Sequence, residues 1–206
     1  GFLASGATVL VTGRDGVRLA EAEASHPNLR GVRSDIGSAS DREALGRHVA
    51  DTMPGLNVVI NNAGIQRRVA LADDRAPWFE RQDEIDVLLS GPIHLNTLLL
   101  PLMLARGGPC LVVTITSGGA YVPQPFAPIY AACKAALHSY TVTLRHSLRN
   151  TAIRVVELIP PAVATGLAGP GRNHGAPPDR FCYEAQERLD LGGNVLPGWK
   201  VRVTRR

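Results

Sequence analysis

The residues best suited to chemistry in this chain are Tyr130 and Lys134, which stand four positions apart in the stretch YAACKAAL. On a helix, positions i and i+4 share one face, so the phenol and the ammonium would point into the same space. A cation beside a phenol stabilises the phenolate, which lowers the pKa of the tyrosine and suits it to acid–base work. The pair predicts a proton-transfer site, although an amphipathic helix can also carry this spacing by chance.

The lysine itself is informative because the chain has twenty arginines and only two lysines, Lys134 and Lys200. A helix surface that needed only positive charge would here almost always carry arginine. Arginine cannot replace a compact ammonium that donates hydrogen bonds in a confined space beside a phenol. Lys134 is therefore predicted to serve chemistry rather than solubility.

Two further motifs close apolar runs upstream of this pair. Ser117 ends the run CLVVTITS, thirteen residues before Tyr130, and the sequence NNAG at 61–64 ends the run LNVVIN. Serine and Asn-Asn-Ala-Gly also occur in simple turns. At the carboxyl ends of buried strands, however, such residues lie where parallel sheets bind ligands.

The elements that must position these residues follow from the hydrophobic pattern. Apolar runs of strand length alternate with amphipathic segments of helix length, which is typical of an α/β fold with a parallel sheet. Ser38 or Ser40 is placed to cap the second helix. We predict strands at 7–12, 29–34, 56–61, 110–116 and 153–159, and helices at 16–25, 41–53, 82–106 and 127–149.

These motifs, in this order and at this spacing, resemble the short-chain dehydrogenase/reductases. The resemblance implies a Rossmann-type, doubly wound parallel sheet and an oxidoreductase that moves hydride between NAD(P)(H) and a carbonyl or alcohol on a small organic substrate. It also implies roles for the three catalytic candidates. Ser117 would polarise the substrate carbonyl, Tyr130 would donate the proton, and Lys134 would hold the nicotinamide ribose.

The resemblance extends to the cofactor. Arg14 follows the strand end LVTG, and a basic residue there implies NADP(H) in preference to NAD(H), which remains possible; a surface arginine is the alternative. Asp35 would flank the adenine or cap the next helix. The cofactor-binding residues implied are Arg14, Asp35, Ile36, Asn61, Ala63, Gly64, Tyr130, Lys134, Val163 and Thr165.

The chain departs from the family at three places. No strand and glycine-rich turn precede ATVLVTGR, and GFLASG reads as the end of a helix stopped by Gly6. In the order 3-2-1-4-5-6 the missing strand is central, so we expect a partial domain with either two separate ladders or a rearranged sheet. Leu88 stands where the family has an asparagine that supports a proton relay, and Pro161 replaces a glycine.

Length and composition favour one partial NAD(P)-binding domain over 1–206, with a divergent lid and tail at 166–206 that contains only a short strand candidate at 201–204. The helices at 82–106 and 127–149 are more apolar than one sheet face needs. Since family members commonly pair these helices between subunits, we expect a homodimer or homotetramer. The alternative function is a non-catalytic remnant or interaction subunit.

Other classes are disfavoured. The net charge is +4, but basic residues are interleaved with acids, which favours a solvated surface over nucleic-acid binding. Asn96 and Pro101 interrupt the longest apolar run, so no membrane span is expected. Cys110, Cys133 and Cys182 favour reduced thiols in the cytoplasm. The histidines lack metal-ligand spacing, and no metal is expected.

Overall fold

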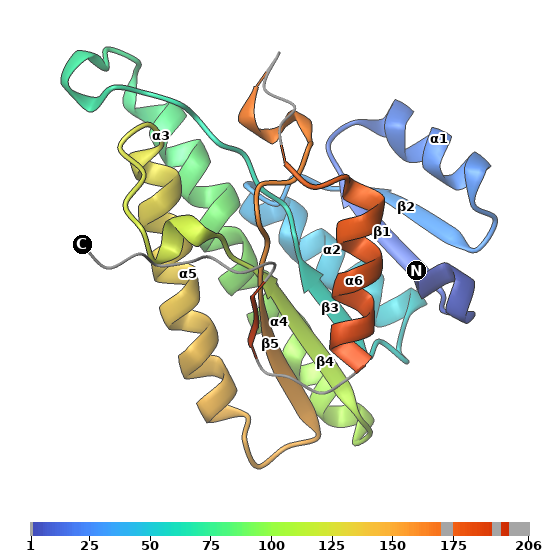
Figure 1. Cartoon of the computed structure of the whole chain (residues 1–206). Coiled ribbons are helices and arrows are strands. Elements are labelled where there is room, and N and C mark those ends of the chain that lie inside the picture. Colours follow the sequence, from blue (N-terminus) through green and yellow to red (C-terminus); the bar gives the residue numbers. More distant parts are fainter. Residues whose placement is uncertain (1, 170–174, 191–194, 198–206) are drawn as a thin grey trace.

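A computed structural model describes residues 2–169, 175–190 and 195–197 of the chain (Figure 1). The strands of this described part are β1 (Val9–Gly13), β2 (Leu29–Arg33), β3 (Val58–Asn61), β4 (Cys110–Ile115), β5 (Ile153–Ile159) and β6 (Val195–Pro197). Its α-helices are α1 (Gly16–Ser25), α2 (Ala39–Thr52), α3 (Trp78–Ile85), α4 (Gly91–Arg106), α5 (Pro128–Ser147) and α6 (Pro178–Asp190).

The strands form two parallel sheets. One contains β1 and β2, and the other has the order β3-β4-β5-β6. This is the α/β arrangement expected from the sequence. Of the two arrangements expected, the division into two ladders is confirmed, because β1 and β3 share no ladder in the described part of the chain.

The four-stranded sheet is covered on both faces (Figure 1). Alternation along β4 and β5 sends Val112 and Val155 to one face and Val113 and Val156 to the other. The first face packs against side chains of α2, α4 and the end of α5, including Leu45, Val49, Leu99, Met103, Leu144 and Leu148. The second packs against α6 through Ala185 and Leu189.

Local capping explains where the helices begin and end. Asp15 accepts hydrogen bonds from the backbone of Val17 and Arg18 and so begins α1. Of the two serines proposed for α2, Ser38 is the N-cap, since its hydroxyl accepts from Asp41 N at 3.3 Å. Gly107, with φ of 72°, ends α4 in the left-handed conformation.

The helical segment expected at 82–106 is longer and less regular than expected. From Trp78 to Arg106 the chain passes through α3, a π-helical turn (Asp86–Ser90) and α4. By length and composition this segment could cross a membrane, which the sequence analysis did not expect. The support for a span is weak, because buried core helices meet the same criterion and α4 packs against α2.

The chain after β5 differs from the sequence-based expectation as well. A short parallel strand, β6, lies beside β5, with Glu157 opposite Val195. The strand candidate at 201–204 lies outside the described residues.

Phe2 begins a short 3-10 helix (Phe2–Ser5) that ends before Gly6, whose φ is 81°, as expected for a helix stop.

Candidate active site

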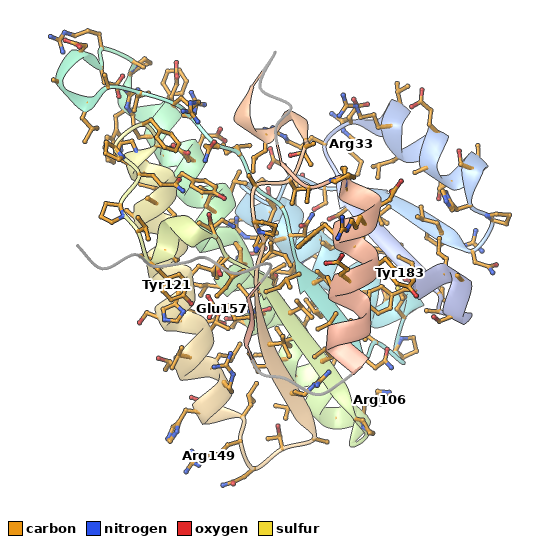
Figure 2. All side chains as sticks on the ribbon, in the orientation of Figure 1. Arg33, Arg106, Tyr121, Arg149, Glu157 and Tyr183 are labelled. Carbon is orange, nitrogen blue, oxygen red and sulfur yellow. The ribbon has the colours of Figure 1, made fainter. Side chains whose placement is uncertain are left out.

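The candidate site lies at the carboxyl edge of the parallel strands. Asn61 ends β3, Ser117 follows β4, and Val163 follows β5, so the parallel topology brings them to the same edge. The opposite edge carries the end of α4 and the turn after α5, where Figure 2 shows Arg106 and Arg149. Helix α5 begins near the site edge and supplies Tyr130 and Lys134.

Ser117 and Tyr130 influence one another at this edge. The serine caps a 3-10 turn (Gly118–Ala120), its Oγ accepting from Gly119 N at 3.1 Å. The Ser117 side chain also acts on Tyr130, since its hydrogen-bonding capacity favours a lower pKa of the phenol. Tyr130 itself is 6% exposed. Ser117 and Tyr130, thirteen residues apart in the sequence, thus lie at the same edge of the sheet.

Lys134 lies one helical turn after Tyr130 and is 4% exposed. Its Nζ donates to the Ile115 carbonyl oxygen at 2.7 Å and lies 5.7 Å from the centroid of the Tyr130 ring. Burial disfavours the ammonium and lowers the pKa of Lys134 to about 8. The ammonium thereby anchors the end of β4 next to Ser117.

The expected lowering of the Tyr130 pKa is wrong in this structure. Burial raises the pKa of Tyr130, the hydrogen bond from Ser117 opposes that rise, and the negative charge of Glu84 adds to it. The physical reason is that Lys134 directs its ammonium to the Ile115 carbonyl, while the dry surroundings of the phenol penalise the phenolate. Tyr130 is therefore held as a protonated phenol.

Glu84, on α3, lies near the candidate site although no sequence pattern indicated it. Its carboxylate is 1% exposed and accepts from Arg67 N at 3.0 Å. Burial raises the pKa of Glu84, and its charge also contributes to raising the pKa of the neighbouring Cys133 thiol to about 11. An acidic residue in an amphipathic helix gives no sequence signal of this burial.

Leu88, at the position of the family's relay asparagine, lies in the π-helical turn and is fully buried. It packs in one apolar cluster with Ala127, Tyr130 and Cys133. The Leu88 side chain in the cluster of Tyr130 is thus hydrocarbon, which neither donates nor accepts a hydrogen bond.

The NNAG segment is held by an amide pair. Asn61 is 8% exposed, and its Nδ2 donates to Asn96 Oδ1 at 3.0 Å. Asn96, buried in α4, donates in turn to the Tyr140 hydroxyl at 3.3 Å. Ala63 and Gly64 are exposed, and a Cβ on Gly64 would lie 3.5 Å from Leu88. Asn96 therefore supports the predicted turn, a role the sequence analysis did not identify.

The residues predicted for the adenosine end also come together. The guanidinium of Arg14 lies 3.8 Å from the carboxylate of Asp35, with the two side chains 59% and 34% exposed. The Asp35 carboxylate also accepts a hydrogen bond from Gly37 N at 2.9 Å, within the turn that precedes α2. The carbonyl of Ile36 accepts from Arg42 at 2.6 Å. These contacts fix the ends of β1 and β2 beside one another.

Val163 and Thr165 lie in the segment after β5. Val163 forms an isolated parallel bridge with Ala176, and the exposed Thr165 caps a 3-10 turn (Gly166–Ala168) by accepting from Leu167 N. Hydrogen bonds from Ala176 N to the Ala162 carbonyl oxygen and from Ala164 N to the Ala176 carbonyl oxygen tie this segment to residues further along the chain. The backbone is thus ordered around Val163 despite Pro161.

Over 2–169, 175–190 and 195–197, no group of three or more His, Cys, Asp or Glu side chains is arranged to hold a metal ion. The three cysteines are free thiols; Cys110 and Cys133 are buried and Cys182 is exposed.

Comparison with known proteins places the site in context. Residues 1–174 match the family described as short chain dehydrogenase. The uncharacterized oxidoreductase DltE of Bacillus subtilis is 41% identical over 166 residues, which cover 81% of this chain and 66% of the relative. The chain thus spans slightly under two thirds of that protein's length.

Solved structures share the fold. A short-chain dehydrogenase from Sphingobium yanoikuyae in complex with NADPH superimposes with a TM-score of 0.82 at 20% identity, over 91% of this chain and 76% of that one. A short chain dehydrogenase/reductase from Burkholderia phymatum in complex with NAD gives 0.74 at 25% identity, over 95% and 75%.

Proposed function

Because the chain belongs to the short-chain dehydrogenase family, we propose that it catalyses reversible hydride transfer between NADP(H) and the carbonyl or alcohol group of a small organic substrate. The observation that supports this most directly is the grouping of Ser117, Tyr130 and Lys134. The Ser117 side chain lowers the pKa of the buried Tyr130 phenol against the effect of burial, and the ammonium is buried beside the strand end that precedes Ser117.

The residues present fit a nicotinamide ribose. An ammonium has three N–H donors, and Lys134 uses one of them on the Ile115 carbonyl oxygen. No second acceptor for Nζ occurs among the described residues, so two donors are available for ribose hydroxyls. The bound nicotinamide would supply the hydride.

The chain's own groups would handle the proton. The Ser117 hydroxyl would orient the substrate carbonyl oxygen toward Tyr130. The tyrosine would donate its phenolic proton to that oxygen as the alkoxide develops, and would accept it back in alcohol oxidation. Burial raises the pKa of the phenol, so the resting site holds the proton that carbonyl reduction would require.

Arg14 supports the preference for NADP(H). Its side chain is largely exposed, and its ion pair with Asp35 is long, at 3.8 Å, so the guanidinium can turn to a 2′-phosphate at little cost. The two solved relatives were obtained with NADPH and with NAD respectively, so the fold accommodates either dinucleotide.

The second candidate function is a non-catalytic remnant or interaction subunit of the same fold. It is favoured by the buried Leu88 beneath Tyr130 and by the separation of β1 from β3, the strands beside which a dinucleotide would lie. This candidate keeps the architecture but requires no turnover.

Turnover separates the two functions. The chain is mixed with a high concentration of NADPH and a panel of small ketones and aldehydes, and nicotinamide absorbance is followed. We expect Tyr130→Phe to lower kcat by about 100-fold or more, because it removes only the transferred proton. Tyr183→Phe, which removes a phenol hydroxyl from an exposed side chain on α6, is the matched control. If the chain does not turn over any substrate at saturating nucleotide, the second candidate, a non-catalytic remnant or interaction subunit, is favoured.

A further inference from the structure

The carboxylate of Glu157 is fully buried in β5 and has three hydrogen-bond partners. Its Oε1 accepts from Thr116 Oγ1 at 2.7 Å and from the Tyr121 hydroxyl at 3.0 Å. Its Oε2 lies 2.8 Å from Nδ1 of His138, which is on α5. Burying a carboxylate is unfavourable unless it is paired and hydrogen-bonded, so this cluster must be well ordered for the fold to tolerate it.

The two hydroxyl donors bracket Ser117 in the sequence. Thr116 precedes Ser117 directly, and Tyr121 follows it by four residues, yet both donate to the same oxygen of Glu157. Figure 2 shows Tyr121 and Glu157 side by side between α5 and the sheet. The 3-10 turn that presents the Ser117 hydroxyl is thus fastened at both ends to one buried atom.

His138 joins this cluster to the helix of the catalytic residues. It lies four positions after Lys134 on α5, and its ring meets that of Tyr121 edge to face with centroids 4.8 Å apart. Since a carboxylate only accepts, Nδ1 must carry the proton that bonds Glu157. Tyr121, whose own proton goes to Glu157, can accept from the same Nδ1–H at 2.9 Å. All three groups are satisfied by this one tautomer.

We propose that Glu157, together with Tyr121 and His138, is a positioning cluster that fixes the Ser117 turn against α5 and so sets the distance between the Ser117 and Tyr130 hydroxyls. The effect of this cluster on turnover rests on the proposed function. Its effect on the turn rests on the hydrogen bonds themselves. A catalytic hydroxyl displaced by even about 1 Å loses much of its effect on rate, so such a cluster acts on kcat without touching the substrate.

The first test is amide hydrogen exchange of the full chain, followed by NMR. The reporter is the Gly119 amide, which donates to Ser117 Oγ inside the turn. Tyr121→Phe keeps the ring but removes one donor, and we expect Gly119 exchange to rise by about 10-fold while amides in β4 and β5 stay protected. Tyr140→Phe is the matched control and should leave Gly119 unchanged.

Substitutions of Glu157 supply the second arm. Glu157→Gln keeps an oxygen for Thr116 and Tyr121 and should preserve Gly119 protection, while its amide forces His138 to the other tautomer, visible in the ring nitrogen shifts. Glu157→Leu should lose the protection. Where Glu157→Leu does not fold, Tyr121→Phe decides alone.

The hydrogen-exchange results test the positioning cluster separately from the proposed function. In an active preparation, Tyr121→Phe should lower kcat about 10-fold with the KM for nucleotide unchanged. Unchanged Gly119 exchange in Tyr121→Phe would overturn the proposal, as would a uniform rise in exchange across the fold, which would mark a general structural role. If no variant, including the unmodified chain, turns over, the proposed function fails while the exchange result still decides the role of the cluster.

Discussion

Replacing Lys134 by methionine should make the protein more stable at neutral pH. Burial lowers the pKa of Lys134 from its ordinary value of 10.5 to about 8. Each pKa unit corresponds to 1.36 kcal/mol, so holding the ammonium in the folded state costs about 3 kcal/mol at pH 7. Methionine is of similar length and carries no charge, so it removes this cost.

Part of the gain is lost with the hydrogen bond to the Ile115 carbonyl oxygen. A hydrogen bond from a charged donor contributes about 1.5–3 kcal/mol, and the unpaired carbonyl adds a smaller penalty where water cannot reach it. The net expectation for Lys134→Met is an increase of about 1 kcal/mol in the free energy of unfolding at pH 7. The change is positive because the buried ammonium of Lys134 lowers the stability of the folded protein.

The pH dependence provides the internal control. Below pH 8 the lysine is protonated in both the folded and unfolded states, and the folded state bears the whole cost. Between pH 8 and 10.5 the folded state releases its proton first, so the unmodified protein gains stability relative to Lys134→Met as the pH rises. Above 10.5 both states are neutral and the cost is gone.

The assay is urea unfolding of both proteins, monitored by circular dichroism at pH 7 and at pH 10. The free-energy difference should favour methionine at pH 7 and move toward the lysine protein at pH 10. A difference that does not change between the two pH values would refute the electrostatic reasoning, whatever its sign, because packing alone does not titrate.

Three further predictions concern packing, nucleotide affinity and assembly. Gly91→Ala should destabilise the fold by about 1–3 kcal/mol in the same unfolding assay, because its Cβ would lie 2.7 Å from the Ile36 carbonyl oxygen; Gly118→Ala, where a Cβ meets nothing within 4 Å, is the control. The 206-residue chain should bind NADP(H) only weakly in calorimetric titration, since β1 and β3, beside which a dinucleotide would lie, share no ladder in the described part of the chain, and micromolar affinity would contradict this. Light scattering should find a dimer or tetramer that Val142→Asp, on the exposed face of α5, dissociates; a monomer of the unmodified protein at micromolar concentration would contradict the assembly.

The regular elements could be predicted from the sequence because their hydrophobic patterns are strong and local. The apolar run predicted at 110–116 forms β4 (Cys110–Ile115), and the segment predicted at 127–149 forms α5 (Pro128–Ser147). The place of Ser117 at the carboxyl edge of the sheet followed from the same logic, whereas its grouping with Tyr130 was implied by the family resemblance.

The parts that escaped prediction depend on contacts between distant residues or on burial. Glu157 meets Tyr121 across thirty-six positions, and Asn61 meets Asn96 across thirty-five, so no local pattern signals either pair. The direction of the Tyr130 pKa was mispredicted because proximity to a lysine was visible in the sequence, whereas the dryness of the phenol was not. Part of the apolar surface of α4 is buried within the chain, because Leu95, Leu100 and Leu102 pack against the core.

The π-helical turn at Asp86–Ser90 has a geometric consequence for everything beyond it. A π turn accommodates one extra residue, which advances the following helix by about 100° in angular phase relative to an uninterrupted α-helix. That rotation sets the direction in which Asn96 faces Asn61, while Leu88, inside the turn itself, packs in the cluster of Tyr130. Deleting one residue from this turn would swing the amide of Asn96 out of reach of Asn61, so the length of a single helical turn sets whether the NNAG segment is supported at all.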